Sequence, residues 1–328
     1  MNNREEWINL DEFGLSDEEL FAQMPMDETG IERITAPRYS YWHSVFRVFF
    51  RKKTNIVVLG ALVVLFVFAY IYPSIHGYDQ YVNIMDSTTY HLKPSAAIER
   101  FGFNISWVFG TGESGQSTFD AIWYGARISV TLSIICAAIN LSIGVVVGAV
   151  WGFSKRLDLV MTEVRNIIGN VPNTLIISVM VLVFSPSFWT LIFAMCITGW
   201  MGVAGQLRTQ VIIIRDRDYN LASKCLGTST FRIAIRNILP HMTSIIVTMA
   251  ATEIPGYISM ETFLSYIGLG ISDTTLGKII FNAQSAMVTP GWGWEFWPPV
   301  LLAAFISIVL FVVGQNIGDA ADPRTHVL

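Results

Sequence analysis

Charged side chains are scarce in this chain. They make up 14% of its 328 residues, whereas soluble domains carry about 25%. Four stretches contain no Asp, Glu, Lys or Arg at all, namely residues 56–72, 128–154, 166–207 and 296–318. A membrane-spanning helix needs roughly 20 apolar residues, and in lipid its backbone polar groups must bond within the helix. The scarcity therefore excludes an ordinary soluble domain and predicts an all-α membrane protein.

Several chemical motifs are also missing. The chain holds no G-x-x-x-x-G-K-[ST] sequence, which a P-loop ATPase requires. Its three cysteines and five histidines are scattered and show no metal-ligand spacing. Gly110, Gly112 and Gly115 spell G-x-G-x-x-G, but a membrane helix follows instead of a βαβ unit, so we interpret this motif as a turn. We expect no catalytic residue, cofactor, metal or nucleic-acid partner, and hence no enzyme.

The apolar stretches divide into six predicted transmembrane helices. Pro186 splits the longest stretch into two of them. With the N-terminus inside, seventeen Lys and Arg residues fall on the inner side and four on the outer side, in agreement with the positive-inside rule. Both termini are then cytoplasmic, and the chain lies in the cell membrane. The predicted helices span roughly residues 55–76, 127–153, 163–185, 188–207, 237–260 and 298–318.

These helices define the parts of the chain. Residues 1–54 form a cytoplasmic tail and a basic segment next to the membrane. The first 32 residues hold ten acidic side chains and one basic one, and we expect them to stay solvated. The other parts are the first helix at 55–76, an extracellular loop at 77–126, a five-helix core at 127–318 with a cytoplasmic loop at 208–240, and a cytoplasmic tail at 319–328.

The cytoplasmic loop at 208–240 carries the pattern of a short helix. Small or apolar side chains recur at i, i+3, i+4 and i+7 on one predicted face: Tyr219, Ala222, Ser223 and Leu226. Gly227 suits the end of this helix, and a second helix is predicted from Thr228 or Ser229. A helix with small side chains can enter a groove on another protein. It can equally lie on the membrane surface, and the pattern alone does not separate these two interpretations.

The loop and the segments on both sides of it resemble the membrane subunits of ABC importers. Ala222, Gly227 and Ile238-Leu239-Pro240 fit the cytoplasmic "EAA…G…I-LP" loop of that family. Further segments are similar to its peptide and nickel subfamily and lie in the same order: Gly110–Gly115 with Tyr124–Ser129, Thr198–Trp200, Glu261 with Leu264–Gly270, and Gly318–Arg324. Together they cover roughly residues 100–328. This combination resembles the second, C-type permease of a dipeptide or oligopeptide importer.

The resemblance implies a type I ABC importer permease fold and a set of partners. Two related permeases would form the pathway across the lipid bilayer as a heterodimer, two cytoplasmic ATPases would bind their loops, and an extracellular binding protein would deliver peptide. The loop helix would be the coupling helix, seated in an ATPase cleft. Asn220 stands where the family carries Glu, so we expect the contact to depend more on shape than on charge. The residues assigned to this contact are Asp218, Tyr219, Asn220, Leu221, Ala222, Ser223, Lys224, Leu226, Gly227, Thr228, Arg232, Ile238, Leu239 and Pro240.

Glu253 and Glu261 are the candidates for a pathway or an outer gate. Sixteen uncharged residues separate Glu253 from Arg236, and a carboxylate at membrane depth tends to face a water-filled path or a partner. The alternative is that the fifth helix emerges from the membrane near Glu253, so that the side chain is simply hydrated. Length favours this alternative, because Glu253 lies about 24 Å along the helix from Asn237 at 1.5 Å per residue, near the outer boundary. Glu261 lies within the segments that resemble the family.

Two other functions compete with peptide import. The first is an ABC permease for nickel or another small solute, against which the absence of His or Cys clusters argues mildly. The second is a membrane receptor or scaffold that senses extracellular peptide through residues 77–126 and 261–297. The loop motif argues against a receptor, because a receptor needs no ATPase groove.

Overall fold

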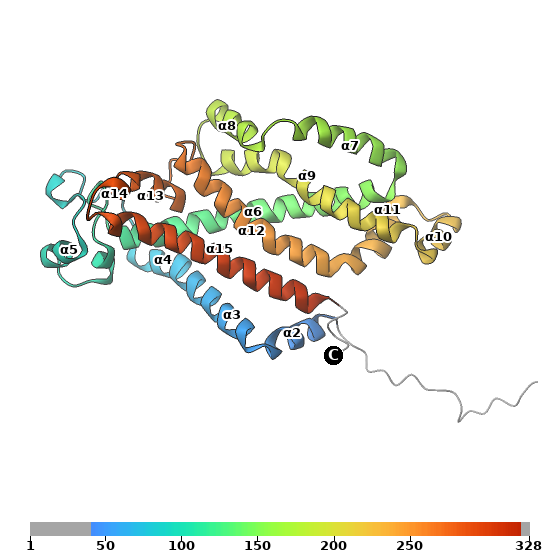
Figure 1. Cartoon of the computed structure of the whole chain (residues 1–328), viewed down its shortest axis with the longest axis horizontal. Coiled ribbons are helices and arrows are strands. Elements are labelled where there is room, and N and C mark those ends of the chain that lie inside the picture. Colours follow the sequence, from blue (N-terminus) through green and yellow to red (C-terminus); the bar gives the residue numbers. More distant parts are fainter. Residues whose placement is uncertain (1–40, 323–328) are drawn as a thin grey trace, which may run out of the picture. The chain divides into compact units, whose positions relative to one another are not determined.

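The computed structural model describes residues 41–322, and every regular element in that range is helical (Figure 1). The predicted acidic tail lies outside the described residues, as do residues 323–328. The longer helices are α2 (Tyr41–Arg51), α3 (Lys53–Phe66), α5 (Pro94–Phe101), α6 (Thr118–Phe153), α7 (Lys155–Gly169), α8 (Asn173–Phe184), α9 (Phe188–Arg215), α10 (Asp218–Cys225), α12 (Thr243–Tyr266) and α15 (Gly293–Ala321). The shorter ones are α4 (Tyr72–His76), α11 (Thr230–Ile233), α13 (Leu276–Asn282) and α14 (Gln284–Val288).

Among the described residues, four helical segments are long and apolar enough to cross a membrane by themselves: Lys53–His76, Thr118–Phe153, Phe188–Arg215 and Gly293–Ala321. The pair α7 and α8 would provide a fifth crossing, although it is bent by 71°. Helix α12 has 24 residues and carries Glu253 and Glu261, and it is not among these segments. An all-helical protein with several membrane crossings is therefore confirmed, whereas the number six stays a prediction.

The third predicted span, at residues 163–185, is not one continuous helix. The chain breaks between Gly169 and Asn173, and the two halves meet at 71°. Pro172 explains the break, because proline lacks an N–H and its ring clashes with helical backbone before it. The predicted turn at Pro186 is present, and Ser185 beside it adopts a left-handed φ of 67°.

The fifth predicted helix is displaced along the sequence. We expected residues 237–260, but a π-helical turn (Ala234–Ile238) and a 3-10 turn (Leu239–Met242) precede α12, which begins at Thr243 and ends at Tyr266. Pro255 lies inside α12 and does not end it. Membrane helices tolerate such prolines when neighbouring groups satisfy the freed backbone. Helix α12 thus continues past Glu253, and the point at which it leaves the membrane stays a prediction.

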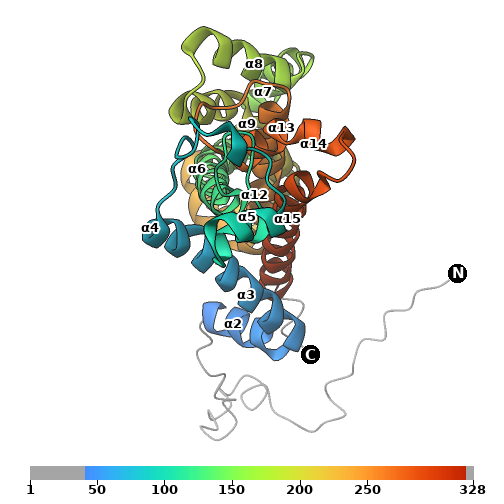
Figure 2. The same ribbon diagram turned by 90° about the vertical axis from the view of Figure 1, so that its left-hand side faces the viewer.

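Helix α6 lies against both α9 and α12, as the view along the helices in Figure 2 shows. Glycines on α6 allow this close packing. A Cβ atom at Gly148 would lie 2.6 Å from the carbonyl oxygen of Ala204, and one at Gly144 would lie 2.6 Å from the Cβ of Val203. Small residues of this kind allow membrane helices to approach one another closely, so the α6–α9 contact depends on the missing side chains.

A polar cluster fixes the last turns of α9. The Asp158 carboxylate accepts hydrogen bonds from Trp151 Nε1, at 2.9 Å, and from Arg208. The Arg208 guanidinium also lies 5.5 Å from the centre of the Trp151 ring. Arg215 Nη1 donates to the Gly152 carbonyl oxygen at 3.1 Å. These contacts keep α9 helical to its last residue, so the loop that we predicted from residue 208 begins only after Arg215.

The two segments predicted to lie outside the membrane meet at one end of the bundle, where Figure 1 places α5, α13 and α14. Residues 77–126 and 261–297 are joined there by three hydrogen bonds: His91 Nδ1 with Glu295 Oε2 (2.8 Å), Thr274 Oγ1 to Gln80 Oε1 (3.2 Å), and Asn282 Nδ2 to Glu113 Oε1. Helices α10 and α11 lie at the opposite end (Figure 1). The fold thus separates an outer-segment end from a loop end.

Candidate functional site

The loop end begins with α10, which is attached to the end of α9 through Asn220. The Asn220 side chain is only 1% exposed, and its Nδ2 donates to the Ile214 carbonyl oxygen at 3.1 Å. We had assigned Asn220 to the contact with a partner. The structure instead places its side chain inside, where it holds α10 at a fixed angle to α9.

Helices α10 and α11 present large apolar side chains to solvent. Leu226 is 86% exposed, and Tyr219, Leu221 and Phe231 are also exposed. Exposed apolar groups gathered in one place are typical of a surface that another protein or a membrane covers. The face predicted from the sequence points outward: Tyr219, Ala222 and Leu226 are exposed, and Ser223 is half-buried. We call these exposed apolar residues, Tyr219, Leu221, Leu226 and Phe231, the loop face.

Gly227 ends α10 with the hydrogen bonds of a Schellman motif. Its φ is +79°, its N–H donates to the Lys224 carbonyl oxygen at 3.0 Å, and the Thr228 N–H donates to the Ser223 carbonyl oxygen at 3.1 Å. This pairing satisfies carbonyl groups that the helix end leaves free, and it requires a residue in the left-handed conformation. The predicted role of Gly227 at the helix end is confirmed.

The second half of the loop packs into the bundle, and we call it the anchor. Ile233, Ala234 and Ile238 are fully buried. Ala234 and Ile238 lie in one apolar cluster with Leu207 and Val211 of α9. The assigned residues therefore divide by exposure. Asp218, Tyr219, Leu221, Ala222, Lys224, Leu226, Gly227, Arg232 and Pro240 are exposed, Ser223, Thr228 and Leu239 are half-buried, and Asn220 and Ile238 are buried.

A cavity of about 210 Å³ lies beside the middle of α12. It is lined from three helices: Asn173 and Ile177 of α8, Met195 and Gly199 of α9, and Glu253 and Tyr257 of α12. Glu253 stands near the midpoint of α12, about 15 Å from its first residue at 1.5 Å per residue. The structure thus places this predicted residue at a cavity, well inside the helix.

Hydrogen bonds order the polar groups of the cavity wall. The Tyr257 hydroxyl accepts from Asn140 Nδ2 at 2.7 Å, and Thr198 Oγ1 donates to Asn173 Oδ1. Sequence reasoning missed Asn140, Asn173 and Tyr257. A signal for one of them was present, because Asn140 is the only amide side chain in the uncharged stretch 128–154.

Glu261 does not share the environment of Glu253. Its side chain is 0% exposed, and its carboxylate accepts from Ser129 Oγ and Ser265 Oγ, each at 2.8 Å. Ser129 Oγ in turn accepts from the Leu276 N–H at 3.2 Å. Glu261 therefore connects α6, α12 and α13 inside the chain, and of the two candidate pathway residues only Glu253 lines the cavity.

Replacing Glu261 is expected to unfold the protein at lower temperature than replacing Glu253. Glu261→Ala leaves two buried serine hydroxyls without their acceptor, and each unsatisfied buried donor costs about 1–3 kcal/mol. Glu253→Ala, on the same helix, is the matched control, because it only enlarges a cavity. Thermal unfolding of both purified variants in detergent measures the difference. Equal melting temperatures for the two variants would contradict a bonding role for Glu261.

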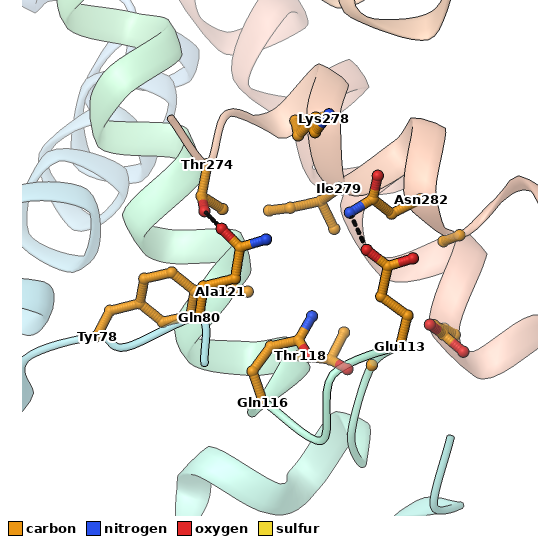
Figure 3. A pocket seen from close by; sticks show the side chains of 13 residues that line it. Tyr78, Gln80, Glu113, Gln116, Thr118, Ala121, Thr274, Lys278, Ile279 and Asn282 are labelled. Atoms are coloured by element: carbon orange, nitrogen blue, oxygen red, sulfur yellow. Dashed lines mark hydrogen bonds between the residues drawn. The ribbon is translucent and has the colours of Figure 1, made fainter. Parts of the chain in front are cut away.

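A second, smaller cavity lies at the outer-segment end (Figure 3). Its volume is about 20 Å³, which is room for a water molecule but not for a peptide. Figure 3 shows the hydrogen bonds of Thr274 with Gln80 and of Asn282 with Glu113 across it. Burial raises the pKa of Tyr78 in its wall to about 12, so the phenol stays neutral at physiological pH. This cavity joins the outer segments and offers no pathway.

These features define a class of protein, a helical membrane protein with an exposed apolar loop face at one end and a carboxylate-lined cavity near the middle of its helices. Residues 140–327 match the family described as binding-protein-dependent transport system inner membrane component. Residues 40–94 match the N-terminal TM domain of oligopeptide transport permease C. The chain belongs to this family of transport permeases and is a multi-pass protein of the cell membrane.

Individual relatives agree with the family. The chain is 43% identical over 314 residues to the oligopeptide transport system permease protein AmiD of Streptococcus pneumoniae, covering 94% of this chain and 98% of that protein. It is 33% identical to the dipeptide transport system permease protein DppC of Bacillus subtilis, covering 89% of each. It is 32% identical to the oligopeptide transport system permease protein OppC of Bacillus subtilis, covering 89% of this chain and 93% of that protein.

Proposed function

We propose that this chain is one permease subunit of an ATP-driven ABC importer for oligopeptides or dipeptides. It forms half of the translocation pathway and couples that pathway to separate ATPase subunits. The observation that carries the proposal is the loop face, which exposes Tyr219, Leu221 and Leu226 in and after α10 and Phe231 on α11. Helix α10 is attached to the end of α9 through Asn220. The similarity to peptide permeases supports the substrate class.

The loop supplies a mechanism for coupling. An ATPase cleft would cover the loop face, because burying exposed apolar side chains favours association. A displacement of α10 would be passed to α9 through the Asn220 hydrogen bond and to the bundle core through the buried anchor around Ile238. Helices α9 and α12 both line the cavity that holds Glu253. Movement at the loop would therefore change the shape of the pathway.

The proposed topology has six crossings, with α12 as one of them and both termini in the cytoplasm. The excess of Lys and Arg on the loop side supports this orientation. The partners are a related permease, two cytoplasmic ATPases and an extracellular peptide-binding protein. The apolar residues of α12 and the cavity at its side support a pathway between this chain and the paired permease.

Co-purification and uptake together test the function. The chain, tagged and extracted in mild detergent, is expected to bring with it a related permease and two ATPase chains. Proteoliposomes holding this complex are expected to take up peptide only with ATP inside and loaded binding protein outside. The chain purified alone is expected to hydrolyse no ATP above a mock preparation. A complex without ATPase chains, or ATP hydrolysis by the isolated chain, would reject the proposed division of labour.

A further inference from the structure

Glu253 is an acidic side chain without a counter-charge in the described part of the chain. The four ion pairs found among residues 41–322 involve Asp86, Asp158, Asp216 and Glu295, and none involves Glu253. The other residues that line its cavity are one amide, two hydroxyls, two methionines, an isoleucine and two glycines. A carboxylate near the middle of a membrane-spanning helix is costly unless a cation or water meets it. Because no residue of the described part forms an ion pair with Glu253, we expect a matching cation in the substrate or in a partner.

The cavity is large enough and open enough to admit a cationic group. Its volume of about 210 Å³ is roughly ten times that of the outer cavity. Thr252 and Gly256, which flank Glu253 in its lining, are exposed. Gly199 keeps the opposite wall open, since a Cβ there would lie 2.6 Å from the Tyr257 hydroxyl and 2.7 Å from Asn140 Nδ2. The cavity is thus reached from the surface of the chain and is not sealed within it.

The chemistry of the wall favours an organic cation over a metal ion. Glu253 is the only acid in the lining, and no histidine lies there. Divalent metals require several oxygen or nitrogen ligands, whereas an ammonium or guanidinium group pairs well with one carboxylate. The Tyr257 hydroxyl accepts a hydrogen bond from Asn140, and its own O–H is directed to the Glu253 carboxylate. A single carboxylate held in place by a neighbouring O–H suits one positive group, such as those that a peptide carries.

We infer that Glu253 binds a cationic group of the transported peptide, its α-ammonium or a lysine or arginine side chain, as the peptide passes the middle of the membrane. Tyr257 donates a hydrogen bond to Glu253 and so orients the carboxylate toward the cavity. This inference rests on the proposed function and adds the chemistry of the pathway site. A basic side chain of the paired permease is the competing source of charge. The volume of about 210 Å³ gives room for a cationic group of the peptide, and the experiment below separates the two sources.

Uptake by the reconstituted complex tests the inference. The three substrates are Ala-Lys-Ala, Ala-norleucine-Ala and Ala-Glu-Ala, each delivered by the same saturating binding protein. The quantity measured is the uptake rate of each variant divided by that of the unmodified complex, so that the preference of the binding protein cancels. Glu253→Gln removes the charge, and Glu253→Asp keeps it. Glu163→Gln, on the exposed side of α7, is the matched control for loss of one negative charge.

Glu253→Gln is expected to lower uptake about tenfold, a loss that corresponds to one modest ion pair. An equal loss for all three peptides, largely restored in Glu253→Asp, assigns the α-ammonium. A loss confined to Ala-Lys-Ala assigns the side-chain cation. Glu163→Gln is expected to retain the uptake of the unmodified complex.

Three results overturn the inference. The first is unchanged uptake of all peptides by Glu253→Gln. The second is an equal loss in the Gln and Asp variants, which assigns the effect to packing. The third is loss of the paired permease from purified Glu253→Gln complexes, which assigns the counter-charge to that subunit. If the unmodified complex takes up none of the peptides, the proposed function itself fails, and the inference fails with it.

Discussion

Gly227→Val is expected to reduce peptide uptake at least about tenfold while leaving the amount of folded protein in the membrane unchanged. Gly227 has a φ of +79°, where an L-residue costs about 1–2 kcal/mol and a β-branched one more. No atom lies within 4 Å of a Cβ built at this position, so the effect is one of backbone conformation and not of packing. The strained turn would shift Leu226 and the loop face relative to the anchor.

The measurement compares uptake and ATP hydrolysis in proteoliposomes with the level of inserted protein. Gly227→Asn is the matched control, because asparagine tolerates the left-handed conformation. It is expected to retain most of the uptake. Normal uptake by Gly227→Val would reject the coupling role of this turn, and equal losses in both variants would assign the effect to the side chain and not to the backbone.

Gly148→Leu is expected to prevent recovery of folded protein. A Cβ at Gly148 would lie 2.6 Å from the Ala204 carbonyl oxygen and 2.9 Å from the Ala204 Cα. Both atoms belong to the backbone of α9 and cannot turn aside as a side chain can. Even Gly148→Ala is expected to lower stability by about 1–3 kcal/mol, the usual cost of overpacking. Fluorescence-detected size exclusion and thermal unfolding in detergent give the two readouts.

Gly60→Leu is the control for this prediction. Gly60 lies inside α3, is exposed, and has no atom within 4 Å of a built Cβ. The same substitution there adds a large apolar side chain to a surface without disturbing a helix contact, so yield and melting temperature are expected to stay close to those of the unmodified protein. Similar yields for Gly60→Leu and Gly148→Leu would show that the α6–α9 contact does not depend on a small residue.

The sequence predicted the helical class but misplaced individual helices. The uncharged stretches identify apolar helices because their lengths reflect the thickness of the bilayer. Pro172 lies inside one of these stretches and introduces a bend of 71°. Hydropathy does not reveal this bend, because it depends on composition and not on backbone geometry. Pro255, in contrast, lies inside α12, which continues to Tyr266. A proline breaks one membrane helix and is accommodated in another, and the packing around each decides the outcome.

In the candidate site, too, the sequence predicted one residue's role correctly and misplaced another. Gly227 was identified correctly, because a helix end that requires a positive φ leaves a local signature in the sequence. Asn220 was assigned to a partner contact, but it bonds to the Ile214 carbonyl oxygen inside the chain. The neighbouring helix decides which face of a short helix is buried. The type of a residue therefore does not reveal whether it faces that neighbour or solvent.

The sequence by itself determined that this protein spans the membrane, that its loop around Gly227 holds a helix with an apolar face, and that it resembles importer permeases. Each of these properties is local, since it depends on composition, spacing or one backbone angle. The tertiary structure alone decided the roles of Glu253 and Glu261. They lie on one helix, yet one lines an open cavity and the other is enclosed by Ser129 and Ser265. The difference arises from the neighbouring helices: α8 and α9, distant in sequence, line the cavity at Glu253, whereas α6, also distant, and α13, the next helix along the chain, surround Glu261.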